Sequence, residues 1–165
     1  MQLKVGLSVA RAFAAEGAAV ALADISEEES KKQSLEIKET FGVDAIGVKC
    51  DVGDTISVQN AIKETSEAFN GLDTIACMAA TLTERLDIVD LPEDEWNRTL
   101  NVNLTGSFLV CKHGIPFLRE AGGGSIILTA SQMGQVAWPG STAYCTTKGG
   151  ILPVSYTHLT LPTKA

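Results

Sequence analysis

The chain has 165 residues, of which 45% are hydrophobic and 20% are charged, a balance typical of a globular domain with a sizeable core. Its formal net charge is -7, which leaves no excess of basic groups to neutralise phosphates, so we expect no nucleic-acid partner. The four cysteines lie far apart and form no CxxC pair. This spacing favours free thiols in a reducing compartment over a disulfide framework or a metal site.

The N-terminal region resembles a secretory signal at first sight, with an early lysine, an apolar stretch and the ending Ala21-Leu22-Ala23. Arg11 and Glu16 interrupt the apolar stretch, and its apolar residues recur at helical spacing. A helix that closes at Gly17 is therefore the better interpretation. No later stretch approaches the roughly 18 apolar residues of a membrane span. We expect a cytoplasmic protein with no membrane partner.

Beyond this first helix, strands and helices are expected to alternate along the chain. Short apolar runs predict buried strands at residues 18–23 and 45–50. Further strands are expected at residues 72–79 and 125–130. Ser26 and Glu29 form a capping box, which predicts the start of the second helix. Helices are expected at residues 26–41, 55–69 and 92–120, and a last helix starts near residue 141.

This alternation predicts an α/β fold of the doubly wound type, a Rossmann-like parallel sheet with helices on both faces and right-handed crossovers. Ligands of such sheets bind at the carboxyl ends of the strands. The residues that directly follow the predicted strands are therefore the first site candidates: Asp24, Asp51, Ala79, Ala80 and Ser131.

The strongest chemical signal is a tyrosine–lysine pair in the last predicted helix. Tyr144 and Lys148 are four residues apart, so they share a helix face and the ammonium can lie beside the phenol. A neighbouring positive charge stabilises a phenolate and lowers the pKa of a tyrosine from about 10, which permits proton transfer near neutral pH. Ser131 can donate a hydrogen bond to a substrate carbonyl or alkoxide. A YxxxK pair taken alone is more often solvated helix surface.

The order of these residues along the chain is more specific than the pair. A strand that ends at Ser131, a loop, and then Tyr144 and Lys148 resemble the active-site segment of the short-chain dehydrogenase/reductase family. The resemblance implies that Tyr144 is the acid/base and that Ser131 orients the substrate. It also implies that Lys148 lowers the pKa of the tyrosine and binds the nicotinamide ribose.

A second motif supports the resemblance. Asn101-Val102-Asn103-Leu104-Thr105-Gly106 resembles the family's Asn-Leu-Thr-Gly segment inside a long helix, and the resemblance implies that Asn103 completes a proton relay. Outside that context, an asparagine within a helix is only a poor helix former. His113 in the same helix is interpreted as a surface or packing residue.

An acidic residue after the first predicted strand favours one nicotinamide cofactor over the other. Asp24 can accept hydrogen bonds from both ribose hydroxyls of an adenosine and repel a 2′-phosphate, and the glutamates at residues 27–29 add negative charge. NAD is therefore favoured over NADP; the alternative is that Asp24 is simply a turn residue. The resemblance implies the other cofactor-binding candidates: Gly6 in the phosphate-binding turn, Asp51 and Val52 at the adenine, and Ala79 and Ala80, which permit close approach.

The sequence also departs from the family pattern. The chain begins almost inside the glycine-rich turn, so we expect an incomplete fold in which the first strand and the C-terminal strands are missing. Cys77 and Met78 replace two asparagines whose amides tie neighbouring strands together. Pro153 is expected to interrupt the last helix. Residues 1–152 are thus interpreted as a partial NAD-binding domain, and residues 153–165, which include His158, as a non-native tail.

These features predict an oxidoreductase that transfers a hydride reversibly between NAD and a small secondary alcohol or ketone. The substrate could be a sugar, a sugar acid, a 3-oxoacyl thioester or an alicyclic alcohol. The resemblance implies a homodimer or homotetramer that packs through an exposed apolar stripe of the 92–120 helix. The alternative is a non-catalytic nucleotide-binding fragment or interaction protein on the same fold. Because the glycine turn is incomplete, these residues alone are expected to have little activity.

Overall fold

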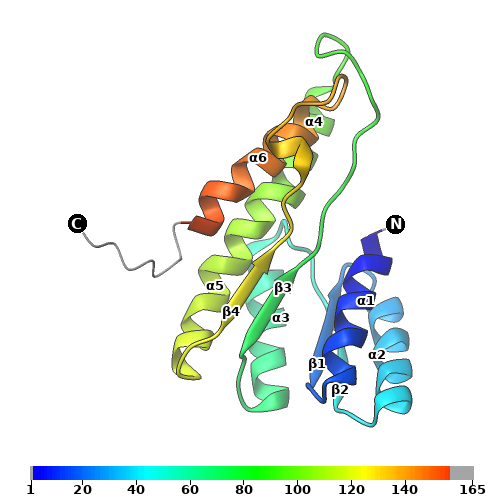
Figure 1. Ribbon diagram of the computed structural model, residues 1–165, viewed down its shortest axis with the longest axis vertical. Helices are drawn as coiled ribbons and strands as arrows, with labels where there is room; N and C mark the ends of the chain where they lie inside the picture. Colours follow the sequence, from blue (N-terminus) through cyan, green and yellow to red (C-terminus); the bar gives the residue numbers. More distant parts are fainter. Residues whose placement is uncertain (1, 157–165) are drawn as a thin grey trace, which may run out of the picture.

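The computed structural model describes residues 2–156 and contains the alternating elements expected from the sequence (Figure 1). The strands are β1 (Val20–Asp24), β2 (Ala45–Lys49), β3 (Thr74–Cys77) and β4 (Ser125–Leu128). The α-helices are α1 (Gln2–Ala15), α2 (Glu27–Phe41), α3 (Thr55–Phe69), α4 (Glu93–Leu100), α5 (Gly106–Glu120) and α6 (Thr142–Tyr156). A π-helical turn, η1 (Asn101–Thr105), joins α4 to α5, and a short 3₁₀ helix, η2 (Gln132–Gly134), follows β4.

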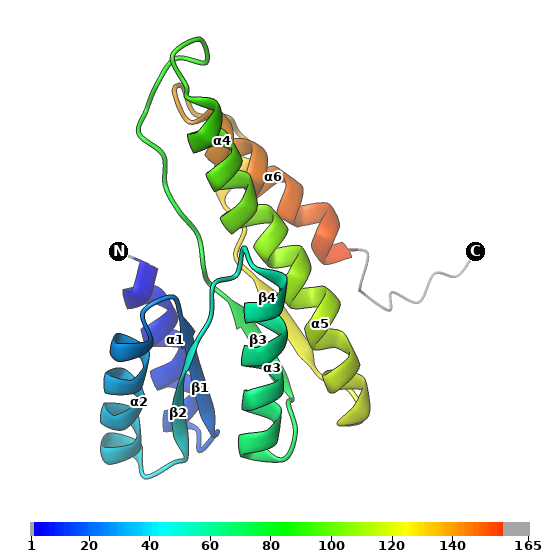
Figure 2. The same ribbon diagram turned by 180° about the vertical axis from the view of Figure 1, so that it is seen from behind.

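The described strands form two separate parallel pairs. β1 pairs with β2, so that Asp24 lies beside Lys49, and β3 pairs with β4, so that Cys77 lies beside Leu128. Helix α1 lies in front of β1 in Figure 1, whereas α3 is in front when the molecule is seen from behind (Figure 2), so helices cover both sides of this doubly wound arrangement. One continuous sheet is not formed, because no described strand joins β1 to β3.

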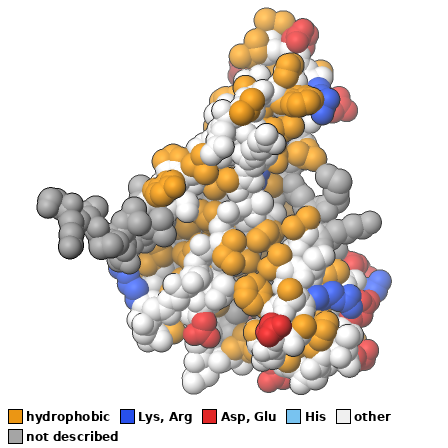
Figure 3. All heavy atoms as spheres, in the orientation of Figure 1, with side chains coloured by type: hydrophobic (Ala, Val, Ile, Leu, Met, Phe, Trp, Pro, Cys, Tyr) orange, Lys and Arg blue, Asp and Glu red, His pale blue; other side chains and the backbone are white. Residues whose placement is uncertain are grey.

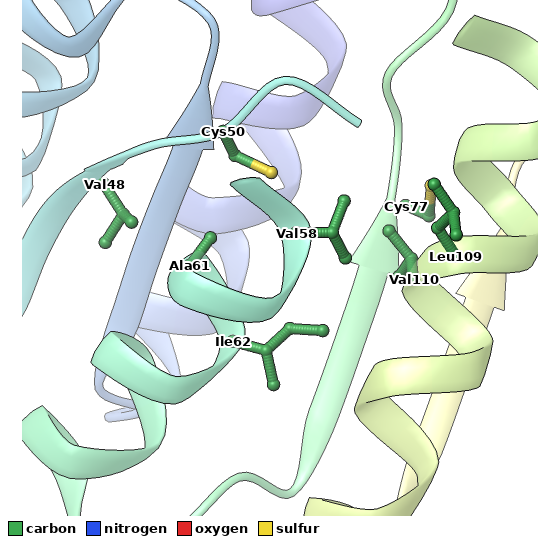
Figure 4. Close-up of a cluster of buried hydrophobic side chains, with 8 residues drawn as sticks. All are labelled: Val48, Cys50, Val58, Ala61, Ile62, Cys77, Leu109 and Val110. Carbon is green, nitrogen blue, oxygen red and sulfur yellow. The ribbon is translucent and has the colours of Figure 1, made fainter. Parts of the chain in front are cut away.

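The main hydrophobic core lies between α3 and α5 and reaches the strands on either side (Figure 4). Val58 and Ile62 of α3 extend toward the side of Leu109 and Val110 of α5, whereas Ala61 lies on the side of Val48. The same core holds two thiols, and burial raises the pKa of the Cys50 thiol to about 11. Cys50, Cys77, Cys111 and Cys145 are all free cysteines, as the sequence predicts.

A second core lies under α1 and α2. Ala14, Val20 and Ile37 are buried there against the β1 side of the molecule. Helix α2 approaches β2 so closely that a Cβ at Gly47 would lie 2.3 Å from the backbone nitrogen of Lys31. A residue with a side chain at this position would push α2 away from the strand, so glycine fixes the distance between the two elements.

The predicted strands are less buried than expected. Val20 is the only fully buried residue of β1, and residues alternate between exposed and half-buried along β4. Ile127 is 42% exposed, and hydrophobic side chains gather on the face of the molecule seen in Figure 3. β4 is partly exposed, because no described helix lies in front of it in the view of Figure 1.

Two expectations about the C-terminal helices need correction. Pro153 does not interrupt α6, which continues to Tyr156. The proline removes one hydrogen-bond donor within the last turn, and the burial of Ile151, only 2% exposed, holds the helix in place. The long helix of residues 92–120 carries no broad apolar stripe, since Phe108 is its one exposed large hydrophobic residue. His158 and residues 157–165 lie outside the described residues.

Candidate active site

The tyrosine and lysine of the YxxxK pair lie together on the first turns of α6. The Lys148 Nζ atom is 5.7 Å from the centroid of the Tyr144 ring, so the two side chains share a helix face as predicted. Lys148 is only 2% exposed, and its Nζ donates a hydrogen bond of 2.7 Å to the backbone carbonyl of Thr129. Burial lowers the pKa of the Lys148 ammonium, an effect that the Cys77 thiol partly opposes.

These two residues open onto a small pocket of about 160 Å³. Ala80, a predicted cofactor-binding residue, lines the same pocket, so the structure brings three of the predicted site residues together. Gly6 lies at its margin, because a Cβ placed on Gly6 would be 3.6 Å from the Cβ of Met78. The complete lining is Val5, Met78, Ala80, Leu82, Thr129, Tyr144 and Lys148.

Asn103 lies in the π-helical turn η1 and is fully buried. Its Oδ1 accepts a hydrogen bond of 2.6 Å from the backbone N–H of Thr81, and its Nδ2 donates to the Thr81 carbonyl at 3.0 Å. The same Nδ2 donates to Thr147 Oγ1 at 3.2 Å. The side chain therefore fastens the segment after β3 to α6, beside the tyrosine, and does not line the pocket.

β4 ends at Leu128, earlier than predicted, and Ser131 lies three residues beyond it, before η2; it is not a lining residue of the pocket. Its Oγ accepts a hydrogen bond of 3.2 Å from the Met133 N–H, which caps η2. This short helix packs tightly on α6, since a Cβ at Gly134 would lie 2.5 Å from the Lys148 carbonyl carbon. Ser131 is therefore held at the start of η2, and Gly134 sets the distance between η2 and α6.

The predicted adenosine-binding residues lie at the ends of β1 and β2 and are not part of this pocket. Asp24 Oδ1 accepts from the Ser26 N–H at 2.9 Å, and Asp51 Oδ1 accepts from the Gly53 N–H at 2.9 Å. Each aspartate therefore holds its own turn, the role expected of a plain turn residue. The second carboxylate oxygen of Asp24 makes no hydrogen bond to a described residue and remains a candidate acceptor for a ribose hydroxyl.

Val52 and Ala79 complete the set of predicted cofactor-binding residues. Val52 packs against α5, where a Cβ on Gly106 would lie 2.9 Å from a Val52 methyl carbon. Ala79 is exposed just beyond β3. The small residues at positions 79 and 80 leave room for a flat ring system against the strand ends, so this part of the site fits a nicotinamide cofactor.

Three threonines at the site were not singled out by sequence reasoning. Thr129 provides the carbonyl that holds Lys148, and its hydroxyl donates to the Cys77 carbonyl at 3.0 Å. This bond ties β3 to β4 at the position where the expected asparagine amides are missing. Thr81 and Thr147 hold Asn103. Their partners are 19 to 52 residues away in the sequence, so no local pattern could have found them.

No group of three or more potential ligand side chains that could hold a metal ion is found in the part of the chain that the structure describes. Among the described helices, none is long and apolar enough to cross a bilayer.

Comparison with known proteins decides the family. Residues 4–157 match the family described as enoyl-(acyl carrier protein) reductase. The 2,5-dichloro-2,5-cyclohexadiene-1,4-diol dehydrogenase of Sphingobium indicum is 37% identical over 146 residues, which are 88% of this chain and 58% of that protein. The chain belongs to the short-chain dehydrogenase/reductase family. The chain spans less than two thirds of the length of the curated relatives that it matches.

Solved structures of this family share the fold. NAD+-bound xylitol dehydrogenase superposes with a TM-score of 0.88 and 31% identity, over 93% of this chain and 58% of that one. An alcohol dehydrogenase from the archaeon Thermococcus sibiricus, complexed with 5-hydroxy-NADP, superposes with a TM-score of 0.84 and 26% identity, over 93% and 63%. The family therefore includes proteins of this architecture with either form of the cofactor.

Proposed function

We propose that this chain is the cofactor-binding and catalytic part of an NAD-dependent dehydrogenase that interconverts a secondary alcohol and a ketone. The observation that carries the proposal is the pocket in which Tyr144, Lys148 and Ala80 meet. It combines a phenol that can exchange a proton, a buried cation beside it and a small residue that leaves room for a flat ring.

Each of these side chains has a role that follows from its chemistry. Tyr144 gives its hydroxyl proton to the substrate oxygen during reduction, and its phenolate takes that proton back during oxidation. The Lys148 ammonium, 5.7 Å from the tyrosine ring centroid, stabilises the phenolate and can donate to a ribose hydroxyl. Ser131 donates a hydrogen bond to the substrate oxygen. Asn103 fastens the segment after β3 to α6 and completes the proton relay. The nicotinamide ring, when bound, supplies or accepts the hydride.

The charge around β1 supports NAD as the cofactor. Asp24 ends β1, and Glu27, Glu28 and Glu29 form the first turn of α2. A 2′-phosphate in this region would face Asp24 and the acidic first turn of α2, in which Glu27 is paired with Lys31, whereas a free ribose hydroxyl can donate to Asp24. Gly6, Asp51, Val52 and Ala79 are the further residues that we assign to cofactor binding.

The substrate is a small alcohol or ketone. The relatives include a cyclic diol dehydrogenase and a xylitol dehydrogenase, which supports an alicyclic alcohol or a sugar alcohol as the substrate class. We further infer a cytoplasmic homodimer or homotetramer, with Phe108 of α5, 45% exposed, as one contact residue.

A second candidate is a nucleotide-binding protein without turnover. One observation favours the absence of turnover: no described strand joins β1 to β3, so the predicted adenosine-binding residues and the tyrosine–lysine pair are not held by one continuous sheet. Binding of NAD with no conversion of any alcohol would support this candidate over the enzyme.

Kinetics of two variants test the enzyme. Tyr144→Phe keeps the ring and removes the transferable proton, so turnover should fall by about 10²–10⁴-fold while the cofactor still binds. Lys148→Ala should also reduce turnover and weaken NAD, because the site loses its buried cation and the donor to a ribose hydroxyl. The assay is the formation of reduced cofactor from a panel of alicyclic and sugar alcohols. Near-normal turnover of Tyr144→Phe would refute the mechanism.

A further inference from the structure

Two long loops leave the site, and they meet again far from the sheet. One follows β3 and climbs to the start of α4, and the other joins η2 to α6 (Figures 1 and 2). At their meeting point the Leu86 N–H donates a hydrogen bond of 3.0 Å to the Gly140 carbonyl. Beside it, the Arg85 guanidinium carbon lies 5.3 Å from the centroid of the Trp138 ring, within the range of a cation–π contact.

Gly140 allows this contact to form. Its φ is 72°, a conformation that favours glycine, and a Cβ at this position would lie 3.2 Å from the Arg85 Cβ. A side chain here would be strained by the backbone and would also press on the neighbouring loop. The close approach of the two loops therefore depends on a glycine that the sequence analysis did not single out.

The contact lies directly before the helix that carries the tyrosine. The Trp138 carbonyl accepts from the Ser141 N–H at 3.2 Å, and the Ser141 carbonyl accepts from the Cys145 N–H at 2.9 Å. The Trp138 N–H in turn donates to Cys145 Sγ at 3.5 Å. These bonds connect Trp138 to the first turn of α6, which contains Tyr144.

The opposite end of the same loop is fastened as well. The Thr81 N–H donates to Asn103 Oδ1 and the Thr81 carbonyl accepts from Asn103 Nδ2, and Leu82, the next residue, lines the pocket with Tyr144. The short segment from residue 81 to residue 86 is therefore fixed at its base by Asn103 and at its tip by Gly140 and Trp138. This segment forms one wall of the pocket through Leu82. Because it is held at both ends, it is more rigid than a free loop of the same length.

We infer that Arg85, Trp138 and Gly140 form a clamp that positions the first turn of α6, and with it Tyr144, against the Leu82 wall of the pocket. Arg85 and Trp138 are positioning residues, since neither lines the pocket. Within the described residues, Arg85 has no carboxylate within 4.0 Å, so the aromatic ring is its main partner. This inference rests on the proposed function only for the role of Tyr144; the clamp itself can be tested without activity.

The first test is spectroscopic. The chain has two tryptophans, so Trp96→Phe leaves Trp138 as the single reporter. Arg85→Met keeps the apolar part of the side chain and removes the cation, and it should increase the quenching of Trp138 fluorescence by acrylamide. Arg85→Lys should restore part of the protection. Arg119→Met is the matched control, because Arg119 is an exposed arginine in the last turn of α5. Gly140→Ala should give a larger increase than Arg85→Met.

The second test is kinetic, with the longest form of the protein that carries this chain. Arg85→Met should lower kcat about two- to fivefold, the size expected for an exposed cation–π contact, while the KM for NAD stays unchanged and Arg85→Lys recovers part of the loss. Unchanged quenching of Trp138 would overturn the clamp. Increased quenching with an unchanged kcat would overturn its positioning role. If no alcohol is converted by the wild type, the proposed function fails and the positioning role falls with it, while the quenching result still decides whether the clamp exists.

Discussion

The two strand pairs hold their polar side chains in different ways. At β1–β2 the partners are sequence neighbours: Asp24 binds the N–H of Ser26, and Asp51 binds that of Gly53. At β3–β4 Ser131 has a local partner, the Met133 N–H, but the partners of Asn103 come from distant parts of the chain. Asn103 binds Thr81, 22 residues away, and Thr147, 44 residues away.

This difference follows from what each region has to do. A turn that presents a carboxylate to a cofactor needs only its own backbone, because the carboxylate can be held by the N–H groups beside it. A proton-transfer site must hold groups from several elements in one geometry, and only contacts across the fold can do so. The long-range network should therefore carry more of the stability than the local turns.

Removal of the Asn103 side chain is the strongest test of that comparison. Asn103→Ala leaves the backbone N–H and carbonyl of Thr81 without these partners in a partly buried place, so we expect a loss of about 2–3 kcal/mol in the free energy of unfolding. Asn101→Ala is the matched control on the same π-helical turn. Asn101 is exposed and makes one bond of 3.3 Å to the Gly53 carbonyl, so its loss should cost about 1 kcal/mol or less. Urea unfolding followed by circular dichroism measures both.

Asp24→Ala tests whether the β1–β2 region determines the preference for NAD over NADP. The variant loses an acceptor for the ribose hydroxyl and one of the charges that repel a 2′-phosphate. The ratio of kcat/KM for NAD to that for NADP should fall about tenfold, the size of one hydrogen bond to a charged group. Asp44→Ala, at an exposed carboxylate paired with Lys38, is the control and should leave the ratio unchanged. A wild-type preference for NADP would contradict the assignment.

Ser26→Ala gives the smallest expected effect and measures a purely local interaction. Ser26 Oγ accepts from the Glu29 N–H at 3.4 Å and caps α2. Loss of this cap should cost about 1 kcal/mol in the same unfolding experiment, without a change in kinetics. If Ser26→Ala destabilises the protein more than Asn103→Ala does, the long-range contacts at β3–β4 do not carry more of the stability than the local contacts at β1–β2.

Much of the local structure could be predicted from the sequence. The second helix begins at Ser26 and is closed by Gly42, with a φ of 70°, because capping and the left-handed conformation are properties of single residues. The capping box is only half formed, since the Glu29 carboxylate accepts from Gln33 and the Ser26 N–H binds Asp24. The helix face shared by Tyr144 and Lys148 was also predictable, because it depends on a spacing of four residues.

The sequence by itself determined the order of the elements, the ends of α2 and α3 and the tyrosine–lysine pair, all of which depend on residues close together in the chain. Only the tertiary structure decided the exposure of β4, the continuation of α6 through Pro153, and the partners of Asn103 and Lys148. The physical reason is that burial and long-range hydrogen bonds depend on which elements pack together. A proline within a helix is tolerated when a neighbour such as Ile151 is buried, and a strand is exposed when nothing covers it.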